Sequence, residues 1–199
     1  MALMTETIMK WDLNDILPLN KFSKLYSEIE EEIKKIKEFF DILSPEMNEN
    51  RFREYIEFNE NLGKKLSRLR IMPELMQAAD QKSQKARELK SKSLDLILKY
   101  SKESRKIEHW MQGKKIEGKK QLDDSNSKRL FNSVPALTYV LSHLRKSERY
   151  TLQEREEEIV SNKNRTGASV LAELRDITET EFSFEFQPDK LKKPQLIKT

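Results

Sequence analysis

Apolar residues recur every three or four positions through three long stretches of the chain, and this spacing constrains the fold more than any other feature. The stretches cover residues 22–43, 50–79 and 84–111. A repeat of three and four places the apolar side chains on one face of a helix. The pattern therefore predicts three long amphipathic helices that pack antiparallel to one another.

Proline and glycine mark where these helices are interrupted. Ser44–Pro45 ends the first helix, and Gly113 ends the third. Within the second helix, Pro73 predicts a kink and Gly63 indicates a close helix crossing. On the third helix, the spacing predicts that the inward-facing residues are Ala86, Leu89, Leu94, Ile97, Tyr100, Ile107, Trp110 and Met111.

The composition agrees with slender helices. Hydrophobic and charged residues each make up 36% of the 199 residues, and the chain has only four glycines and six prolines. Long, narrow helices expose much surface for each unit of core, which reconciles the high charge with a folded protein. The absence of cysteine excludes disulfides and thiol chemistry. The first residues lack the pattern of a signal peptide and no run suits a membrane span, so we expect a cytoplasmic protein that does not enter membranes.

Shorter elements are predicted after residue 120. Asp123 or Asp124 caps a short helix, and Pro135 opens another that runs to about Arg149. Thr151 and Glu154 form a capping box for a helix that runs from Leu152 and ends in a polar loop at residues 162–165.

A final helix and a strand are predicted next. Thr166 caps the helix, whose apolar stripe is Val170, Leu171, Leu174 and Ile177. Alternation of Phe182, Phe184 and Phe186 with polar residues then predicts a strand, which residues 195–198 could pair with as a hairpin. The fold class is thus mainly α, with long antiparallel helices, shorter helices and a small β element near the C-terminus. We expect a long-helix region over residues 1–120, with an N-terminal anchor segment, and a short-helix lobe over residues 121–199.

Several motifs, in order, resemble one family of zinc peptidases. They are Trp11–Asp12–Leu13–Asn14–Asp15–Ile16–Leu17–Pro18, then Lys106–Ile107–Glu108–His109–Trp110–Met111, then Leu122–Asp123–Asp124, then Tyr150–Thr151–Leu152 with its acidic run, Asn164–Arg165–Thr166–Gly167–Ala168–Ser169, and the segment from Thr180 to Phe186. Together they resemble the N-terminal region of oligoendopeptidase F, a branch of the thimet-oligopeptidase superfamily. The resemblance spans most of residues 10 to 199.

The resemblance implies a role without catalysis. Enzymes of this family hold zinc with an H-E-x-x-H helix and a downstream glutamate, and cut short peptides. This chain has two histidines, His109 and His143, and neither begins such a motif. We therefore expect a non-catalytic N-terminal domain that forms part of the substrate cleft, with no catalytic, cofactor or metal residues. Zinc, the catalytic domain and the short peptide substrates would belong to the full-length parent, and the uncovered C-terminal strand would allow self-association.

Other residues suggest sites that we interpret structurally. His109 lies near a helix C-terminus, which favours a protonated histidine, and His143 lies at the edge of an apolar stripe. The acids Glu154, Glu156, Glu157 and Glu158 suit the start of a helix better than a metal site. Residues 166–169 lack the remainder of a phosphate loop, so we interpret them as a helix cap.

Charge is distributed unevenly along the chain. Residues 81–120 hold 13 basic and 5 acidic side chains, whereas residues 1–80 hold 12 basic and 16 acidic ones. We interpret the basic block as a solvated helix face and expect no nucleic-acid partner. A stand-alone helical protein–protein interaction module is the alternative to the peptidase domain.

Overall fold

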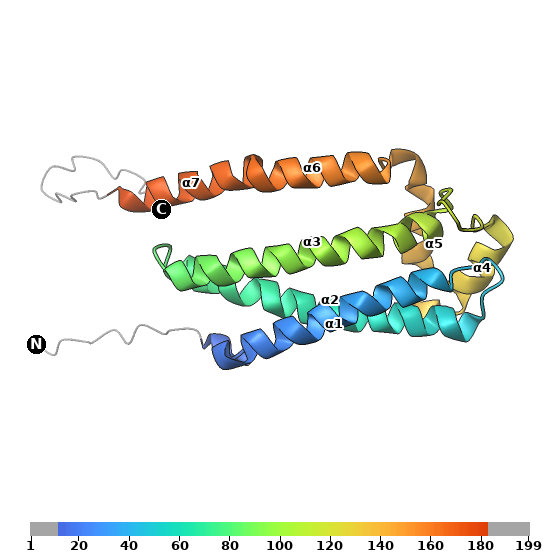
Figure 1. Cartoon of the computed structure of the whole chain (residues 1–199), viewed down its shortest axis with the longest axis horizontal. Coiled ribbons are helices and arrows are strands. Elements are labelled where there is room, and N and C mark those ends of the chain that lie inside the picture. Colours follow the sequence, from blue (N-terminus) through green and yellow to red (C-terminus); the bar gives the residue numbers. More distant parts are fainter. Residues whose placement is uncertain (1–11, 183–199) are drawn as a thin grey trace, which may run out of the picture. The chain divides into compact units, whose positions relative to one another are not determined.

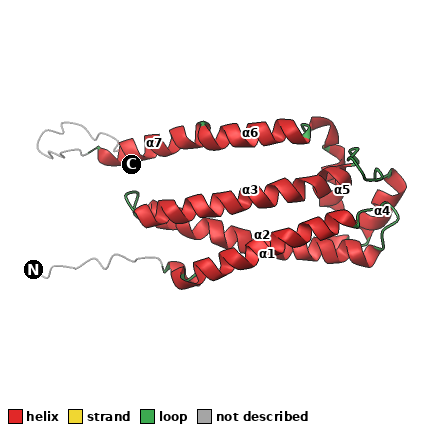
Figure 2. Cartoon of the chain, viewed as in Figure 1, coloured by secondary structure: helices red, strands yellow, loops and turns green. Residues whose placement is uncertain are grey.

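Helices make up nearly all of the part of the chain that the structure describes. A computed structural model describes residues 12–182, and within that range it contains helices and loops but no strand (Figure 2). The mainly helical prediction is therefore confirmed. The predicted strand and hairpin lie outside the described residues, apart from Phe182, which follows the last helix in an extended conformation.

Three long helices form the core of the protein. They are α1 (Phe22–Asp41), α2 (Glu49–Ala79) and α3 (Gln84–Gln112), which run antiparallel and pack against one another (Figure 1). Each buries an apolar face, and dispersion and the hydrophobic effect hold the three faces together. The residues with no exposed surface in this core are Ile29, Ile36, Leu62, Leu69, Ala86, Leu96, Ile107 and Trp110.

The ends of these helices follow local chemistry. The side chain of Asn48 accepts a hydrogen bond from the backbone N–H of Asn50 at the start of α2, and Ser83 caps α3 in the same way through Ala86. Gly113 ends α3 in the left-handed conformation, with a φ of 84°. The start of α1 follows a short 3-10 turn, Leu19–Lys21, without a side-chain cap.

Pro73 and Gly63, both in the interior of α2, differ in how well they match their predictions. The helix continues through Pro73 to Ala79, as predicted, and Pro73 is buried. A close helix crossing at Gly63 was also predicted, and this is wrong: a Cβ atom placed there would meet no atom within 4 Å. The space beside Gly63 opens instead into a surface hollow between α2 and α3.

The inward face of α3 matches the predicted one at both ends of the helix but differs from it in the middle. Leu96 is fully buried and Ser93 nearly so, whereas Leu94 is only partly buried. The hydroxyl of Ser93 lies 2.8 Å from the carbonyl oxygen of Leu69 on α2 and 2.9 Å from that of Leu89, so its one hydrogen has two acceptors in reach. A serine thus occupies a core position that an apolar pattern assigns to its neighbour.

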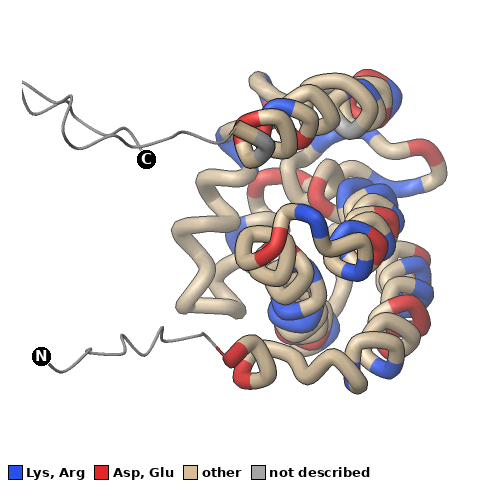
Figure 3. The backbone as a smooth tube through the Cα atoms, turned by 90° about the vertical axis from the view of Figure 1, so that its left-hand side faces the viewer, with Lys and Arg blue, Asp and Glu red and all other residues tan. Residues whose placement is uncertain are grey.

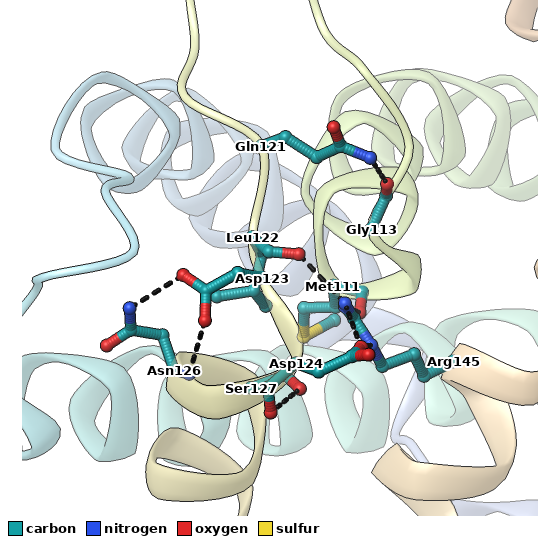
Figure 4. A network of polar contacts seen from close by, with 9 residues as sticks. All are labelled: Met111, Gly113, Gln121, Leu122, Asp123, Asp124, Asn126, Ser127 and Arg145. Atoms are coloured by element: carbon teal, nitrogen blue, oxygen red, sulfur yellow. Dashed lines mark hydrogen bonds and ion pairs between the residues drawn. The ribbon is translucent and has the colours of Figure 1, made fainter.

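Two short helices close one end of this core. They are α4 (Asp124–Asn132), capped by Asp123, and α5 (Thr138–Lys146), which follows a 3-10 turn at Pro135–Leu137. Arg145 of α5 donates to the carbonyl oxygens of Met111 and Leu122 and to Asp124 Oδ1, at 3.3, 2.9 and 2.8 Å (Figure 4). These bonds tie the end of α3 and the loop after it to both short helices.

The last two helices of the described residues, α6 (Glu154–Thr166) and α7 (Ala168–Glu181), include the boundary between two compact units of the chain. Residues group into two compact units, divided between Ile159 and Val160, and α6 contains that division. Gly167 separates α6 from α7. The predicted loop at residues 162–165 is wrong, because α6 continues through it until Gly167, where the backbone leaves the helical region.

The caps predicted for these two helices are also wrong. Helix α6 begins at Glu154 instead of Leu152, and the carboxylate of Glu156 accepts from the backbone N–H of Gln153 at 2.9 Å. The Thr166 hydroxyl bonds to the carbonyl oxygen of Asn162 in the preceding turn instead of capping α7. No helix in residues 12–182 has the length and apolarity that a membrane crossing requires.

Candidate functional site

A polar seam connects the end of α3 to residues 151–157. We use "polar seam" for Arg105, His109, Gln112 and Lys114 on or just after α3, together with Thr151 and Glu157 opposite them. The α3 members recur at helical spacing on one face. Next to them Trp110 has no exposed surface, and its Nε1 donates to the carbonyl oxygen of Lys120 at 2.9 Å. The seam therefore lies next to a fully buried part of the core.

Charged groups form the centre of the seam. Arg105 Nε lies 2.9 Å from Glu157 Oε2, and His109 Nε2 lies 3.6 Å from the same oxygen. The side chains of Arg105 and Glu157 are 18% and 21% exposed, and His109 is 5% exposed. An ion pair in such surroundings is screened less than one at the open surface. The pair thus attaches the start of α6 to α3.

Uncharged acceptors complete the seam. Gln112 Nε2 donates to Thr151 Oγ1 at 3.1 Å, and Lys114 Nζ donates to the carbonyl oxygens of Thr151 and Leu152 at 3.1 and 2.7 Å. Lys114 is 9% exposed, which is unusual for a lysine and is possible because its ammonium has these partners. Thr151, predicted as a helix cap, serves here as an acceptor and donates to the carbonyl oxygen of Ser147.

Glu108 lies beside the seam, and the pKa of its carboxyl is raised. The residue is exposed as a whole, but partial desolvation of its carboxyl raises the pKa, and repulsion from Glu157 raises it further, while Arg105 and Lys114 oppose the shift. A raised pKa in a cluster of charged groups is a feature of many active sites but also of structural ion-pair networks. Here the charged neighbours of Glu108 are bound within the seam, which indicates a structural role.

No arrangement of ligands for a metal ion occurs in the described residues. Within residues 12–182, no group of three histidine, cysteine, aspartate or glutamate side chains is close enough to hold one. His143 is far from His109 in the sequence and lies at the exposed face of α5, where its ring stacks on that of Tyr139 with 6.2 Å between centroids. The acids at 156–158 take part in a cap and in ion pairs with α3.

The basic block contacts the acidic part of the chain. Lys99 lies 2.7 Å from Glu30 on α1, Lys120 lies 3.3 Å from Glu46, and Lys119 donates to the carbonyl oxygen of Asp41. Acidic and basic residues are interspersed along the helices of this core (Figure 3). The excess of positive charge at 81–120 thus complements residues 1–80, a pairing that the sequence analysis did not predict.

An exposed apolar stripe is the main feature of the second unit. Its members on α7 are Val170, Leu171, Leu174 and Ile177, and the first three are 51%, 67% and 58% exposed. They follow one another at helical spacing on one side of α7. We call this set the C-terminal apolar stripe.

Comparisons of the chain with protein-family models, with curated protein sequences and with solved structures found no match.

Proposed function

We propose that this chain is a non-catalytic helical domain of a zinc-dependent oligoendopeptidase. In this role the long helices form one wall of a cleft that admits short peptides, and the zinc and its ligands come from a catalytic part of the same polypeptide. The ordered motifs between Trp11 and Phe186 support the proposal.

The observation that carries the proposal is the C-terminal apolar stripe. Exposed apolar residues that gather on one face of a helix mark an interaction surface more often than a free surface. Leu171 and Leu174 are more than half exposed, and they lie between two of the motifs that resemble the peptidase family. A domain that supports a catalytic part needs such a surface, and burying the exposed part of these two leucines would contribute roughly 2–4 kcal/mol to the contact.

A peptidase assay on quenched short peptides in the presence of zinc tests the proposal. We expect the 199-residue chain to be inactive, and the complete product of its gene to cut short peptides but not folded proteins. Activity of the 199-residue chain alone would contradict the proposal. A complete gene product that shows no activity would favour the alternative, a helical protein–protein interaction module that uses the same stripe.

A pair of variants tests the contribution of the stripe. Leu171→Glu with Leu174→Glu in the complete product is expected to lower its peptidase activity at least about tenfold, because two charges would have to be buried in the contact. Val140→Glu is the matched control, since Val140 is also an exposed apolar residue, 57% exposed, but lies on α5. Equal losses in both variants would show that the stripe has no special part in the assembly.

A further inference from the structure

A cationic groove lies between α1 and α2 and shares no residue with the polar seam. It has a volume of about 460 Å³ and is lined by Glu32 on α1 and by Phe58, Asn61, Lys64, Lys65 and Arg68 on α2. We call it the cationic groove. All but one of its lining residues lie on α2, and Glu32 of α1 borders the groove from the neighbouring helix.

Two cations of the groove have no carboxylate partner. Lys65 Nζ lies 2.6 Å from Glu32 Oε1, so the only acid that lines the groove is already paired. Lys64 and Arg68 are exposed, one helical turn apart, and within the described residues neither forms an ion pair. Like charges at this spacing destabilise a helix by a few tenths of a kcal/mol. Elsewhere on these helices many cations have a partner on their own helix, as Lys34 has in Glu31.

An apolar wall and an amide lie beside these charges. The ring of Phe58 is partly buried and packs against Phe39, with 5.3 Å between ring centroids, so its position is fixed by the core. Asn61 is exposed and carries both a donor and an acceptor. The groove therefore offers positive charge, hydrogen bonds and an apolar contact at one place.

This combination selects among anionic ligands. A nucleic-acid strand requires a row of phosphate contacts and free aromatic faces for stacking, whereas this groove holds a carboxylate and one aromatic ring packed on another. Inorganic phosphate would use the cations but not Phe58. A peptide end with an apolar last residue would use all of them, because it places a carboxylate next to an amide and an apolar side chain.

We propose that the cationic groove binds the C-terminal carboxylate of a short peptide whose last side chain is apolar. Lys64 and Arg68 bind the carboxylate, Asn61 bonds to the last peptide group, and Phe58 contacts the last side chain. The choice of a peptide as ligand rests on the proposed function, whereas the anion site rests on the groove alone.

Binding to the 199-residue chain tests this proposal directly. The probes are N-acetyl-Ala-Ala-Phe and its C-terminal amide, titrated while the backbone amide signals of the protein are followed by NMR. We expect saturable shifts confined to residues 58–68 and their neighbours on α1, and about tenfold weaker binding of the amide, since it lacks the charge that two cations recognise. Binding of the carboxylate should weaken as salt is added.

Charge-removing variants locate the site. Lys64→Gln and Arg68→Gln are each expected to weaken binding about threefold, the size of one partly exposed ion pair. Arg53→Gln is the matched control, because Arg53 is an exposed cation of α2 that does not line the groove. Circular dichroism and the urea midpoint establish that each variant is folded.

Several outcomes would overturn the proposal. These are equal binding of the acid and the amide, no saturation at millimolar peptide, or an equal loss in Arg53→Gln. Tighter binding of inorganic phosphate or of a single-stranded oligonucleotide than of the peptide would show that the ligand class is wrong. Peptide binding here, together with a complete gene product that has no peptidase activity, would support the groove and contradict the proposed function. Peptidase activity of the complete gene product without peptide binding at the groove would support the proposed function and contradict the groove proposal.

Discussion

Two glycines with left-handed backbones distinguish the backbone strain of an added side chain from its steric clash with a neighbour. Gly113 and Gly118 have φ values of 84° and 73°, so alanine at either is strained by about 1–2 kcal/mol. At Gly113 the new Cβ would also lie 2.8 Å from Arg145 Nη1, while at Gly118 it would meet nothing within 4 Å. We expect Gly113→Ala to lower the free energy of unfolding in urea by more than Gly118→Ala does. Equal losses would show that Arg145 moves aside without cost.

Gly63→Ala should act in the opposite direction. The helical backbone of α2 suits alanine at Gly63, and the added methyl group has open space around it. Alanine in a helix interior is favoured over glycine by up to about 1 kcal/mol. We expect urea unfolding to show a gain of this size. A loss would mean that the hollow beside Gly63 is filled in solution.

Glu108 predicts a dependence of stability on pH. Its pKa is raised from the ordinary value of 4.5, so the folded state holds this proton more tightly than the unfolded state does. The contribution of Glu108 is therefore fully present below pH 4.5 and is lost as the pH rises through the folded pKa. Glu108→Gln cannot titrate, so the variant should gain stability relative to the unchanged protein as the pH rises from 4.5 toward about 7.

Urea unfolding across this pH range measures the Glu108 effect. Glu60→Gln serves as the control, because Glu60 is an exposed acid on α2 without an ion pair in the described residues. A constant difference between Glu108→Gln and the unchanged protein across the range would contradict the raised pKa.

Single residues also show what a sequence pattern can predict and what depends on contacts with distant parts of the chain. The spacing placed Ile107 and Trp110 on the inner face of α3, and both are fully buried. Ser93 was not predicted, because its place in the core depends on the carbonyl oxygen of Leu69, which comes from another helix. His109 was placed correctly near a helix end, but its contact with Glu157 depends on a segment much later in the chain.

At the scale of elements, Arg145 connects three of them. Its guanidinium donates to carbonyl oxygens at the end of α3 and before α4 and is 21% exposed. Arg145→Met would keep the apolar stem but leave these acceptors without their donor, at a cost of roughly 2–3 kcal/mol in the free energy of unfolding. Arg149→Met is the control, because Arg149 is exposed and contacts the ring of Tyr150. Similar urea midpoints for the two variants would contradict this account.

Element boundaries were predictable where one residue decides them. Gly113 ends α3 because it adopts a left-handed conformation, and Asp123 caps α4 by accepting from Asn126. The polar run at 162–165 was predicted as a loop, yet its residues are compatible with a helix, and the break comes only at Gly167. The caps at Thr151 and Thr166 failed for a related reason, since both hydroxyls donate to carbonyl oxygens of the turn before them.

At the scale of the whole molecule, segments far apart in sequence carry charges of opposite sign. The acidic first 80 residues and the basic block at 81–120 pair across helices, as in Lys99 with Glu30. The composition indicates the imbalance, but which helix faces which depends on the turns between them. For the same reason the cationic groove could not be predicted: Glu32 and Lys65 come together only when α1 packs on α2.

Exchange of one cross-helix pair tests whether this charge pattern contributes to stability. A hydrogen bond from Lys99 and the charge of Lys99 lower the pKa of Glu30, so the pair stabilises the fold above pH 4.5 and loses its effect as the pH falls through the lowered pKa. Glu30→Lys and Lys99→Glu should each destabilise the protein, and the double variant should recover most of the loss. A coupling of about 0.2–1 kcal/mol is typical of exposed pairs and should shrink in about 1 M salt. The pair of Lys92 with Glu88, both on α3, provides a matched cycle within one helix. If the two single losses simply add in the double variant at low salt, the attraction between the acidic and basic segments does not hold these helices together, and apolar burial alone must account for their packing.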